Sequence, residues 1–286
     1  MSTRKSDIVI DWGDGTIELY TVNKNVVGEN MSSIRHNYNT RYTGDVKIYP
    51  LGGLNDVYAI GFTDNAVPFY EGANGAPKCT QYRFSNEFIK QFSNIIYFYA
   101  YLYYFLYDGY AGVEMSGDWA DIPDSLETLI LPLINTASIP YINCDNFSTN
   151  SNLKNLLISY DINYNTGGSR IYRFNIKGDL AKLPPKIEQV RLWHSRDTTP
   201  IYSGGRNWNA NMDSVYLFGQ APISGGVTTK SLTQTDNDRL LNDLSSVTSW
   251  SGDKKVHTRG TRSSVSNDAV TILESKGVTV TPSAAS

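Results

Sequence analysis

Cysteine and histidine are scarce in this sequence. The 286 residues include two cysteines and three histidines. Cys79 and Cys144 stand 65 positions apart without a Cys-x-x-Cys pair, so the spacing gives a disulfide little support and two unpaired, buried thiols are expected. His36, His194 and His257 are far apart in the chain, and nothing in the sequence brings them together as a zinc site or a Ser-His-Asp arrangement.

Positive charge and long apolar runs are also lacking. The formal net charge is -3, whereas nucleic-acid-binding domains carry a basic patch. The most apolar stretch, residues 95–107, covers about thirteen residues, well short of the roughly 20 needed to span a bilayer. Residues 1–7 lead into a β-like segment without the apolar region of a signal peptide. The sequence therefore predicts a protein that folds in the cytosol, with no nucleic-acid partner and no membrane insertion.

No catalytic or metal-binding pattern is convincing. The sequence has no phosphate-binding Gly-x-x-x-x-Gly-Lys and no dinucleotide fingerprint. Asp11 and Asp14 lack the later ligands of a calcium loop and favour a turn. Asp118 and Asp179, with Glu127 and Glu188, could suggest the paired carboxylates of a glycoside hydrolase, but they recur at one register, which favours a structural corner. We therefore predict no catalytic residue, no cofactor, no metal and no enzyme activity, with a glycan-active enzyme as a weaker hypothesis.

A six-residue pattern with apolar residues at its first, fourth and sixth places dominates the rest of the chain. The copies are residues 92–97, 126–131, 153–158, 187–192 and 212–217. This is the L-x-x-L-x-L core of a leucine-rich repeat. On a strand the fourth and sixth residues face the same way. One strand per unit cannot bury its own apolar face, so the copies are expected to stack side by side.

The copies are arranged in pairs. Their first residues step by 34, 27, 34 and 25, and residues 117–131 align with 178–192 at a shift of 61. The sequence thus predicts a double unit of about sixty residues. Ordinary βαβ alternation with accidental spacing is the alternative.

Residues 7–62 are predicted to form short strands. Asp11-Trp-Gly-Asp-Gly-Thr16 lies between two apolar runs, and Asp-Gly in this setting indicates a hairpin because Gly supplies the positive φ of the turn. Further strands are expected at residues 45–49 and 57–62.

This N-terminal segment resembles the PKD-like β-sandwich. The resemblance rests on the Asp-Trp-Gly-Asp-Gly-Thr turn, on His36-Asn-Tyr38, and on residues 42–48, Tyr-Thr-Gly-Asp-Val-Lys-Ile. It covers about sixty residues and implies a spacer or binding role. The distance to Gly61 is short for a seven-stranded sandwich, so a truncated version packed on the repeats is expected.

Two further segments are distinctive. The aromatic run at 97–107 is interpreted as a layer that closes the open end of the repeat stack, with a ligand platform as the alternative.

Residues 235–244 and 266–277 have helical spacing with caps, and 255–258 and 278–281 are predicted strands. This tail resembles the end of leucine-rich-repeat surface and virion proteins of gut bacteria and their crAss-like phages, where it would cover the last repeat.

The predicted fold class is mixed β and α/β. It comprises a PKD/Ig-like β-domain at 1–75, an irregular leucine-rich-repeat solenoid with parallel strands at 76–221, and a small α/β cap at 222–286. The turn-rich residues 63–91 and the change in composition at 222–226 set these boundaries.

One polar and aromatic cluster is the candidate recognition surface. Its members are Trp193, His194, Ser195, Arg196, Tyr202, Arg206, Asn207, Trp208, Asn209 and Asn211. Exposed rings flanked by Asn and Arg can stack on sugars or anchor a protein interface. The alternative is that Trp193 and Trp208 fill gaps between repeats.

The resemblance implies a non-enzymatic bacteriophage structural protein, a head or tail fibre or a decoration component. Its partners would be other virion proteins and a glycan or protein of the host surface, and a homo-oligomer is left open. It would be assembled in the host cytoplasm and found in the virion. The alternative is a bacterial cell-surface leucine-rich-repeat adhesin whose signal peptide is missing from this sequence.

Overall fold

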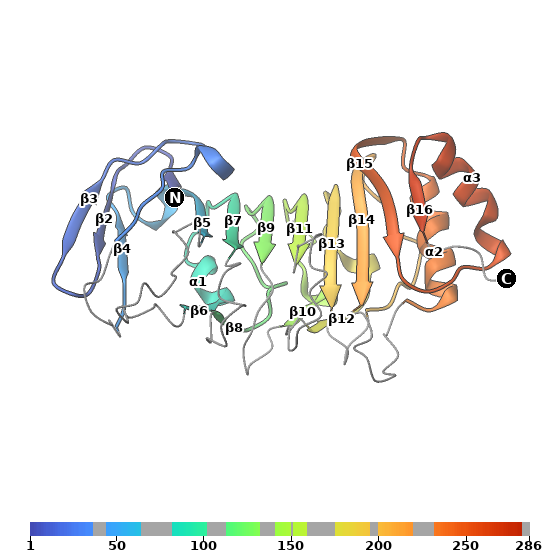
Figure 1. Ribbon diagram of the computed structural model, residues 1–286, viewed down its shortest axis with the longest axis horizontal. Helices are drawn as coiled ribbons and strands as arrows, with labels where there is room; N and C mark the ends of the chain where they lie inside the picture. Colours follow the sequence, from blue (N-terminus) through green and yellow to red (C-terminus); the bar gives the residue numbers. More distant parts are fainter. Residues whose placement is uncertain are drawn as a thin grey trace, which may run out of the picture.

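The protein is a mixed α/β structure dominated by one large, mostly parallel sheet (Figure 1). The computed structural model describes residues 1–36, 44–63, 82–101, 113–131, 141–149, 151–158, 175–194, 200–219 and 232–281. Both predicted domain boundaries fall outside these ranges. Within them, no helix is long and apolar enough to cross a membrane.

Nine strands make up the large sheet. In spatial order they are β1 (Ser2–Thr3), β5 (Val57–Thr63), β7 (Tyr97–Tyr101), β9 (Thr128–Leu131), β11 (Asn155–Ile158), β13 (Gln189–His194), β14 (Asn211–Gly219), β15 (Ser249–Thr258) and β16 (Thr279–Thr281). β1 is antiparallel to β5, and every other neighbouring pair is parallel. The large sheet therefore grows by one strand at a time along the chain.

Four of the predicted six-residue copies lie side by side in register. Their fourth residues, Leu129, Leu156, Val190 and Val215, pair across β9, β11, β13 and β14, and all four are buried. The stacking of these copies, predicted from the spacing, is confirmed.

The first copy was predicted in the wrong register. Phe98, and not Ile95, pairs with Leu129, so this unit runs from Ile95 to Ala100. A sixth copy, missed in the sequence, begins at Val57, because Ile60 of β5 pairs with Phe98. Ile95 lies in the turn before β7, where its backbone N–H donates to Phe92 O at 3.1 Å. The apolar spacing of Phe92 and Ile95 therefore resembled that of a strand although both residues precede it.

The aromatic run does not close an end of the stack. Its described part is β7, which lies between β5 and β9 in the sheet. Phe98 and Ala100 are buried in the core. The predicted capping layer is therefore wrong for residues 97–101, and the remainder of the run lies outside the described residues.

A second layer of short strands and turns covers the inner side of the large sheet. It contains two parallel strand pairs, β6 (Tyr82–Ser85) with β8 (Val113–Ser116) and β10 (Tyr141–Asn143) with β12 (Asn175–Lys177). Short helical segments follow three of these strands: α1 (Asn86–Lys90) after β6, η4 (Cys144–Asn146) after β10 and η5 (Leu180–Lys182) after β12. One continuous apolar core fills the space between the layers. Cys144 belongs to this core as a free thiol whose pKa is raised by burial, and Cys79 lies outside the described residues.

The recurring Gly-Asp pairs occupy equivalent corners of the second layer. Gly117 and Gly178 have φ values of +86° and +81°, and an added Cβ would lie 2.0 Å from Asn86 Oδ1 and 2.4 Å from Asn143 Oδ1, respectively. Asp118 Oδ1 accepts backbone N–H groups of Ala120 and Asn143 at 3.0 Å. Asp179 Oδ1 likewise accepts those of Ala181 and Ser203, at 2.9 and 3.0 Å. The two carboxylates thus accept hydrogen bonds from backbone amides at equivalent corners. This is the structural role that their repeated position in the sequence predicted.

A separate antiparallel sheet lies at the N-terminal end of the molecule (Figure 1). Its strands, in the order β3 (Ile17–Tyr20), β2 (Ile8–Asp11) and β4 (Lys47–Pro50), pack one face on a small core around Ile8, Ile10 and Val22. The helical turns η1 (Gly28–Asn30) and η2 (Leu54–Asp56) flank it in the chain. The predicted hairpin between β2 and β3 is confirmed.

Two helices lie at the C-terminal end. α2 (Gln234–Ser245) is capped by Thr233, whose hydroxyl accepts Asp236 N–H at 3.1 Å. α3 (Asn267–Ser275) follows the turn η6 (Ser264–Ser266) and packs on α2. Leu240, Leu244 and Leu273 complete the main core. The predicted helices and strands of the tail are confirmed in type, but β15 (Ser249–Thr258) begins six residues before the predicted strand at 255–258.

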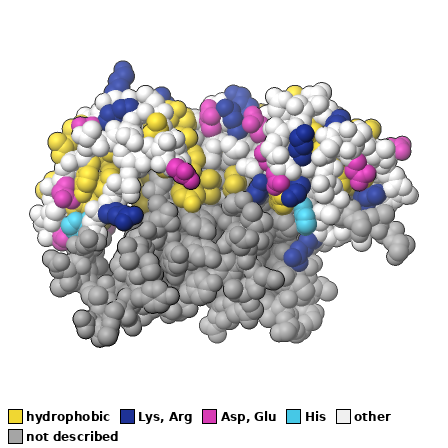
Figure 2. All heavy atoms as spheres, turned by 45° about the horizontal axis from the view of Figure 1, so that its top comes forward, with side chains coloured by type: hydrophobic (Ala, Val, Ile, Leu, Met, Phe, Trp, Pro, Cys, Tyr) yellow, Lys and Arg dark blue, Asp and Glu magenta, His cyan; other side chains and the backbone are white. Residues whose placement is uncertain are grey.

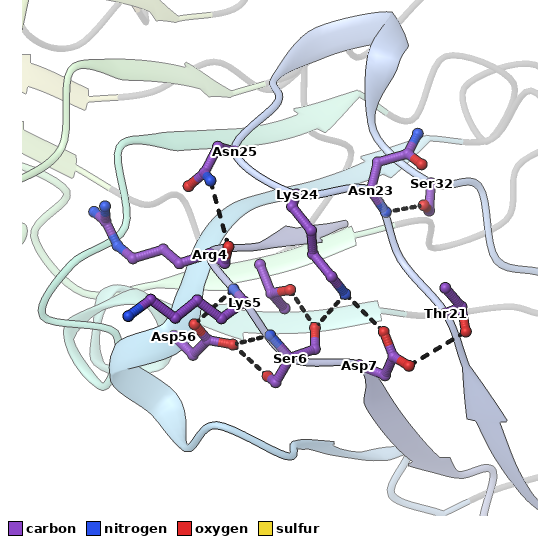
Figure 3. A network of polar contacts seen from close by, with 11 residues as sticks. Arg4, Lys5, Ser6, Asp7, Thr21, Asn23, Lys24, Asn25, Ser32 and Asp56 are labelled. Atoms are coloured by element: carbon purple, nitrogen blue, oxygen red, sulfur yellow. Dashed lines mark hydrogen bonds and ion pairs between the residues drawn. The ribbon is translucent and has the colours of Figure 1, made fainter.

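A polar network joins the small sheet to the large one (Figure 3). Asp56, buried at the end of η2, accepts the backbone N–H of Ser6 at 2.7 Å and of Lys5 at 3.0 Å, as well as the Ser6 hydroxyl. Lys24 contacts Asp7 Oδ1 at 2.6 Å and Ser6 O at 2.6 Å. Because residues 4–7 link β1 to β2, these contacts fix how the small sheet is held against the large one.

Removing the Asp56 carboxylate should loosen this junction. Burial raises the pKa of Asp56, but hydrogen bonds from Ser6 and Lys5 outweigh it and leave the pKa below its usual value of 3.8. A lowered folded-state pKa contributes stability above the unfolded-state pKa, and that stability is lost as the pH falls through the folded value. We therefore expect Asp56→Ala to lower the free energy of unfolding of the N-terminal sheet by about 3 kcal/mol at pH 7, because two amides lose their acceptor.

Hydrogen exchange of the Lys5 and Ser6 amides and thermal denaturation measure this effect. The gap between wild type and Asp56→Ala should narrow as the pH falls from 3.8 toward the lowered folded-state pKa of Asp56, where the carboxylate of the folded wild type becomes protonated. Glu29→Ala, at an exposed acidic residue of the same region, is the matched control and should change neither readout. A gap that persists unchanged at pH 3 would contradict the assignment.

Candidate functional site

The predicted recognition surface is largely buried. Tyr202, Arg206 and Trp208 are all buried side chains, so the expectation of exposed rings is wrong for Tyr202 and Trp208. Their partners explain the burial: Trp208 Nε1 donates to the Tyr202 hydroxyl at 3.0 Å, which donates to Asp243 Oδ2 of α2 at 2.7 Å. Trp208 thus fills a gap between the repeats and the C-terminal helices, whereas the alternative interpretation placed it, with Trp193, between repeats.

Arg206 is the centre of this buried cluster. Its guanidinium donates to the carbonyl oxygens of Ala181 at 3.2 Å, Leu183, and Pro184 at 2.6 Å, and it lies 4.5 Å from the centroid of the Trp208 ring. Burial lowers the pKa of Arg206 to about 10, partly opposed by Tyr202. The group stays charged at neutral pH and holds the η5 turn to the segment before β14. Its role here is structural.

The other predicted site residues belong to the end of β13 and to the segments between β13 and β14. Trp193 and His194 are the last residues of β13, and their side chains lie outside the described part of the structure, as does Arg196. Asn209 is half-buried and donates to Lys186 O at 3.0 Å. Its amide therefore supports the corner before β14.

The structure brings a different set of polar side chains together on the outer face of the sheet. Arg191, Tyr216 and His257 are register partners on β13, β14 and β15. The Arg191 guanidinium lies 4.7 Å from the centroid of the Tyr216 ring, which stacks on His257 at 5.9 Å and 11°. Figure 2 shows acidic, basic and histidine side chains gathered over this region. We call these three residues, together with Asp253 and Lys255, the bulge site.

A bulge in β15 places Asp253 over this row. Between the pairs Met212–Trp250 and Ser214–Lys255, β14 advances by two residues and β15 by five. The extra residues include Gly252 at φ +58° and Lys254 at φ +47°, and the latter is an unfavourable conformation for a residue with a side chain. Bulges that re-aim a side chain, and residues held under strain, are frequent at functional sites.

Asp253 is the hub of the bulge site. It contacts Arg191 Nη2 and Lys255 Nζ, each at 3.2 Å, and accepts the Tyr216 hydroxyl. The Tyr216 hydrogen bond holds the pKa of Asp253 below its usual value, against burial and with help from Lys255. Burial lowers the pKa of His257, and nearby Arg259 and Lys255 lower it further. At neutral pH the site therefore presents an ionised aspartate, two cations and a neutral imidazole.

The chemistry available here is recognition by hydrogen bonds and charge. Arg191, Lys255 and His257 supply donors for carboxylate, phosphate or hydroxyl groups. No group of three or more potential metal ligands occurs in the described ranges. Arg191 and Tyr216 occupy the fifth position of their six-residue copies, where Ile130 and Leu157 stand in earlier units. The change from aliphatic Leu157 to charged Arg191 at this outward position was the sequence signal that could have found the site.

Comparison with protein-family models, with curated proteins and with solved structures gave no match. The fold itself defines a mixed α/β protein built around an open parallel sheet.

Proposed function

We propose that this chain is a non-enzymatic structural protein of a bacteriophage particle that makes contacts through the outer face of its sheet. The observation that carries the proposal is the bulge site, where three neighbouring strands align donors on one face. A stacked-strand architecture presents such rows on a rigid scaffold, which suits binding better than catalysis. The fibre or decoration role follows from the resemblance of the repeats and the C-terminal tail to virion proteins.

A host-surface glycan or protein is the proposed ligand of this face. Arg191, held by Asp253 at 3.2 Å, and Lys255 place two positive charges on this face, which favour an anionic ligand. The Tyr216 ring lies between Arg191 and His257. The ligand would therefore contact the side chains of Arg191 and His257 at the two ends of the row, and not the face of the Tyr216 ring. The alternative proposal, a bacterial cell-surface adhesin, uses the same surface and differs only in the genetic context.

Two experiments test the proposal separately. Mass spectrometry and reconstruction of purified particles should find the chain among the virion proteins, and its absence from particles would overturn the phage assignment. A neighbouring lipoprotein or secretion signal in the gene would favour the adhesin.

The binding face is tested with the purified chain on host cells and on an array of host-surface glycans. Arg191→Ala combined with His257→Ala should weaken binding at least tenfold, because a charged donor and an imidazole are lost from one row. Lys182→Ala, at an exposed cation of the opposite layer, is the matched control and should bind like the wild type. Equal loss in both variants would contradict the assignment of the face.

A further inference from the structure

The imidazole of His36 is held between two carboxylates of the β2–β3 hairpin. Its Nε2 lies 2.8 Å from Asp14 Oδ2, in the turn of the hairpin, and its Nδ1 lies 4.0 Å from Glu18 Oε2 on β3. The ring also stacks on Trp12 at 4.6 Å and 12°. Three side chains of the hairpin therefore fix both the position and the plane of this histidine.

Both carboxylates are ionised over the pH range in which an imidazole changes its charge. The hydrogen bond with His36 holds the pKa of Asp14 below its usual value of 3.8. Glu18 Oε2 accepts the hydroxyl of Tyr20 and, at 2.7 Å, Nε1 of Trp12, and these two hydrogen bonds hold the pKa of Glu18 below 4.5. Because imidazoles titrate between about pH 5 and 8, His36 gains or loses its charge beside two constant negative charges.

The contacts give the two ring nitrogens different roles. An ionised Asp14 only accepts hydrogen bonds, so Nε2 of His36 carries the hydrogen of the 2.8 Å contact. In the neutral ring Nδ1 is then an acceptor, and it lies 4.0 Å from the negatively charged Glu18 Oε2, which is unfavourable. Proton uptake at Nδ1 turns this repulsion into attraction and makes the Asp14 hydrogen bond one between opposite charges. Protonation therefore strengthens both contacts of His36 with the hairpin.

His36 ends a short segment whose beginning is also fixed. The Ser32 hydroxyl accepts the backbone N–H of Asn23 at 2.7 Å, and the Ser32 N–H donates to Met1 O at 3.1 Å. Between these two ends Ile34 packs on the small core. The contacts of His36 therefore hold the far end of residues 32–36 on the hairpin and keep Ile34 over the small core.

We propose that His36 is a pH-sensitive clasp that controls how tightly residues 32–36 are held on the β2–β3 hairpin. As the pH falls from about 8 to about 5, the imidazole gains its second N–H and attracts Asp14 and Glu18 together. At higher pH the neutral ring keeps the Asp14 hydrogen bond but is repelled by Glu18, so the segment opens more often. The exposed Arg35 is the next cation along the segment, and its charge is constant over this range. The clasp is independent of the bulge site and of any ligand.

Hydrogen exchange of the purified full chain, corrected for the intrinsic pH dependence of amide exchange, tests the proposal. The Trp12 amide donates to Thr16 O and the Thr16 amide to Asp14 Oδ1, both at 3.0 Å, so these two amides report on the turn that His36 contacts. In the wild type their protection should be about threefold or more higher at pH 5.5 than at pH 8, the size expected for two partly exposed ion pairs. Amides of β9 in the large sheet should show no such difference.

Three variants separate the clasp from a general effect of pH. His36→Gln keeps a donor for Asp14 but cannot gain a charge, so the protection of the turn should be equal at the two pH values. Glu18→Gln should reduce the pH dependence without abolishing it, because the Asp14 contact still gains a charge. Arg35→Gln removes an exposed cation of the same segment, is the matched control and should behave like the wild type. Equal protection of the wild type at the two pH values, or a pH dependence that His36→Gln and Glu18→Gln leave intact, would overturn the proposal.

Discussion

Leu129→Ala is expected to lower the free energy of unfolding by about 3 kcal/mol. Leu129 is completely buried in the middle of β9, and its register partners on β7 and β11, Phe98 and Leu156, belong to the same core. Truncation would remove apolar contacts with both neighbouring units and leave a cavity, because paired backbones on two sides prevent the core from collapsing into it. Urea denaturation followed by circular dichroism measures the loss.

The next residue of the same strand is the matched control. Ile130 faces outward and is only half-buried, so Ile130→Ala should cost about 1 kcal/mol or less. The contrast between adjacent residues tests which face of the sheet is the core. Equal losses at the two positions would mean that both faces of β9 are packed.

Arg206→Ala should be comparably harmful, with a loss of about 3 to 4 kcal/mol. Without the guanidinium, the carbonyl oxygens of Ala181, Leu183 and Pro184 lose a buried donor, and each unsatisfied group costs about 1–3 kcal/mol. The contact with the Trp208 ring is also lost. Loss of the charge itself offsets part of this cost, because a buried cation is poorly solvated.

Two further variants define the cause. Arg206→Lys keeps the charge but not the planar fork, so it should recover less than half of the loss. Arg239→Ala removes an exposed arginine of α2 whose Nη1 lies 3.8 Å from Asp236 Oδ1, and it should change stability by about 0.5 kcal/mol or less. Thermal and urea denaturation of the three variants rank these effects. A fully stable Arg206→Ala would show that the cluster does not hold the C-terminal helices.

The repeat pattern predicted the large sheet because its physical cause is local. A strand with apolar residues two places apart must bury that face, and five such strands can do so together only by lying side by side. The same logic failed at residues 92–97, where Phe92 and Ile95 are buried at a corner and not on the strand. Apolar spacing cannot distinguish a buried corner from a buried strand.

The predicted surface around Tyr202 failed for a different reason. Tyr, Trp and Arg are enriched in interfaces, but the same side chains also satisfy one another in a buried network when a partner such as Asp243 comes from elsewhere in the chain. Asp243 lies 37 residues after Arg206 in α2, and no sequence pattern reveals that contact. The bulge in β15 was equally hidden, because an extra three residues in one strand become visible only through register.

The shared direction of the strands has an evolutionary consequence. From β5 to β16 every strand of the large sheet ends at the same rim, so the segments that follow successive strands all depart from that rim. Insertions or substitutions there can diversify independently while the buried rows stay constant. A lineage under pressure to change what it contacts could therefore vary one border of the molecule without refolding it.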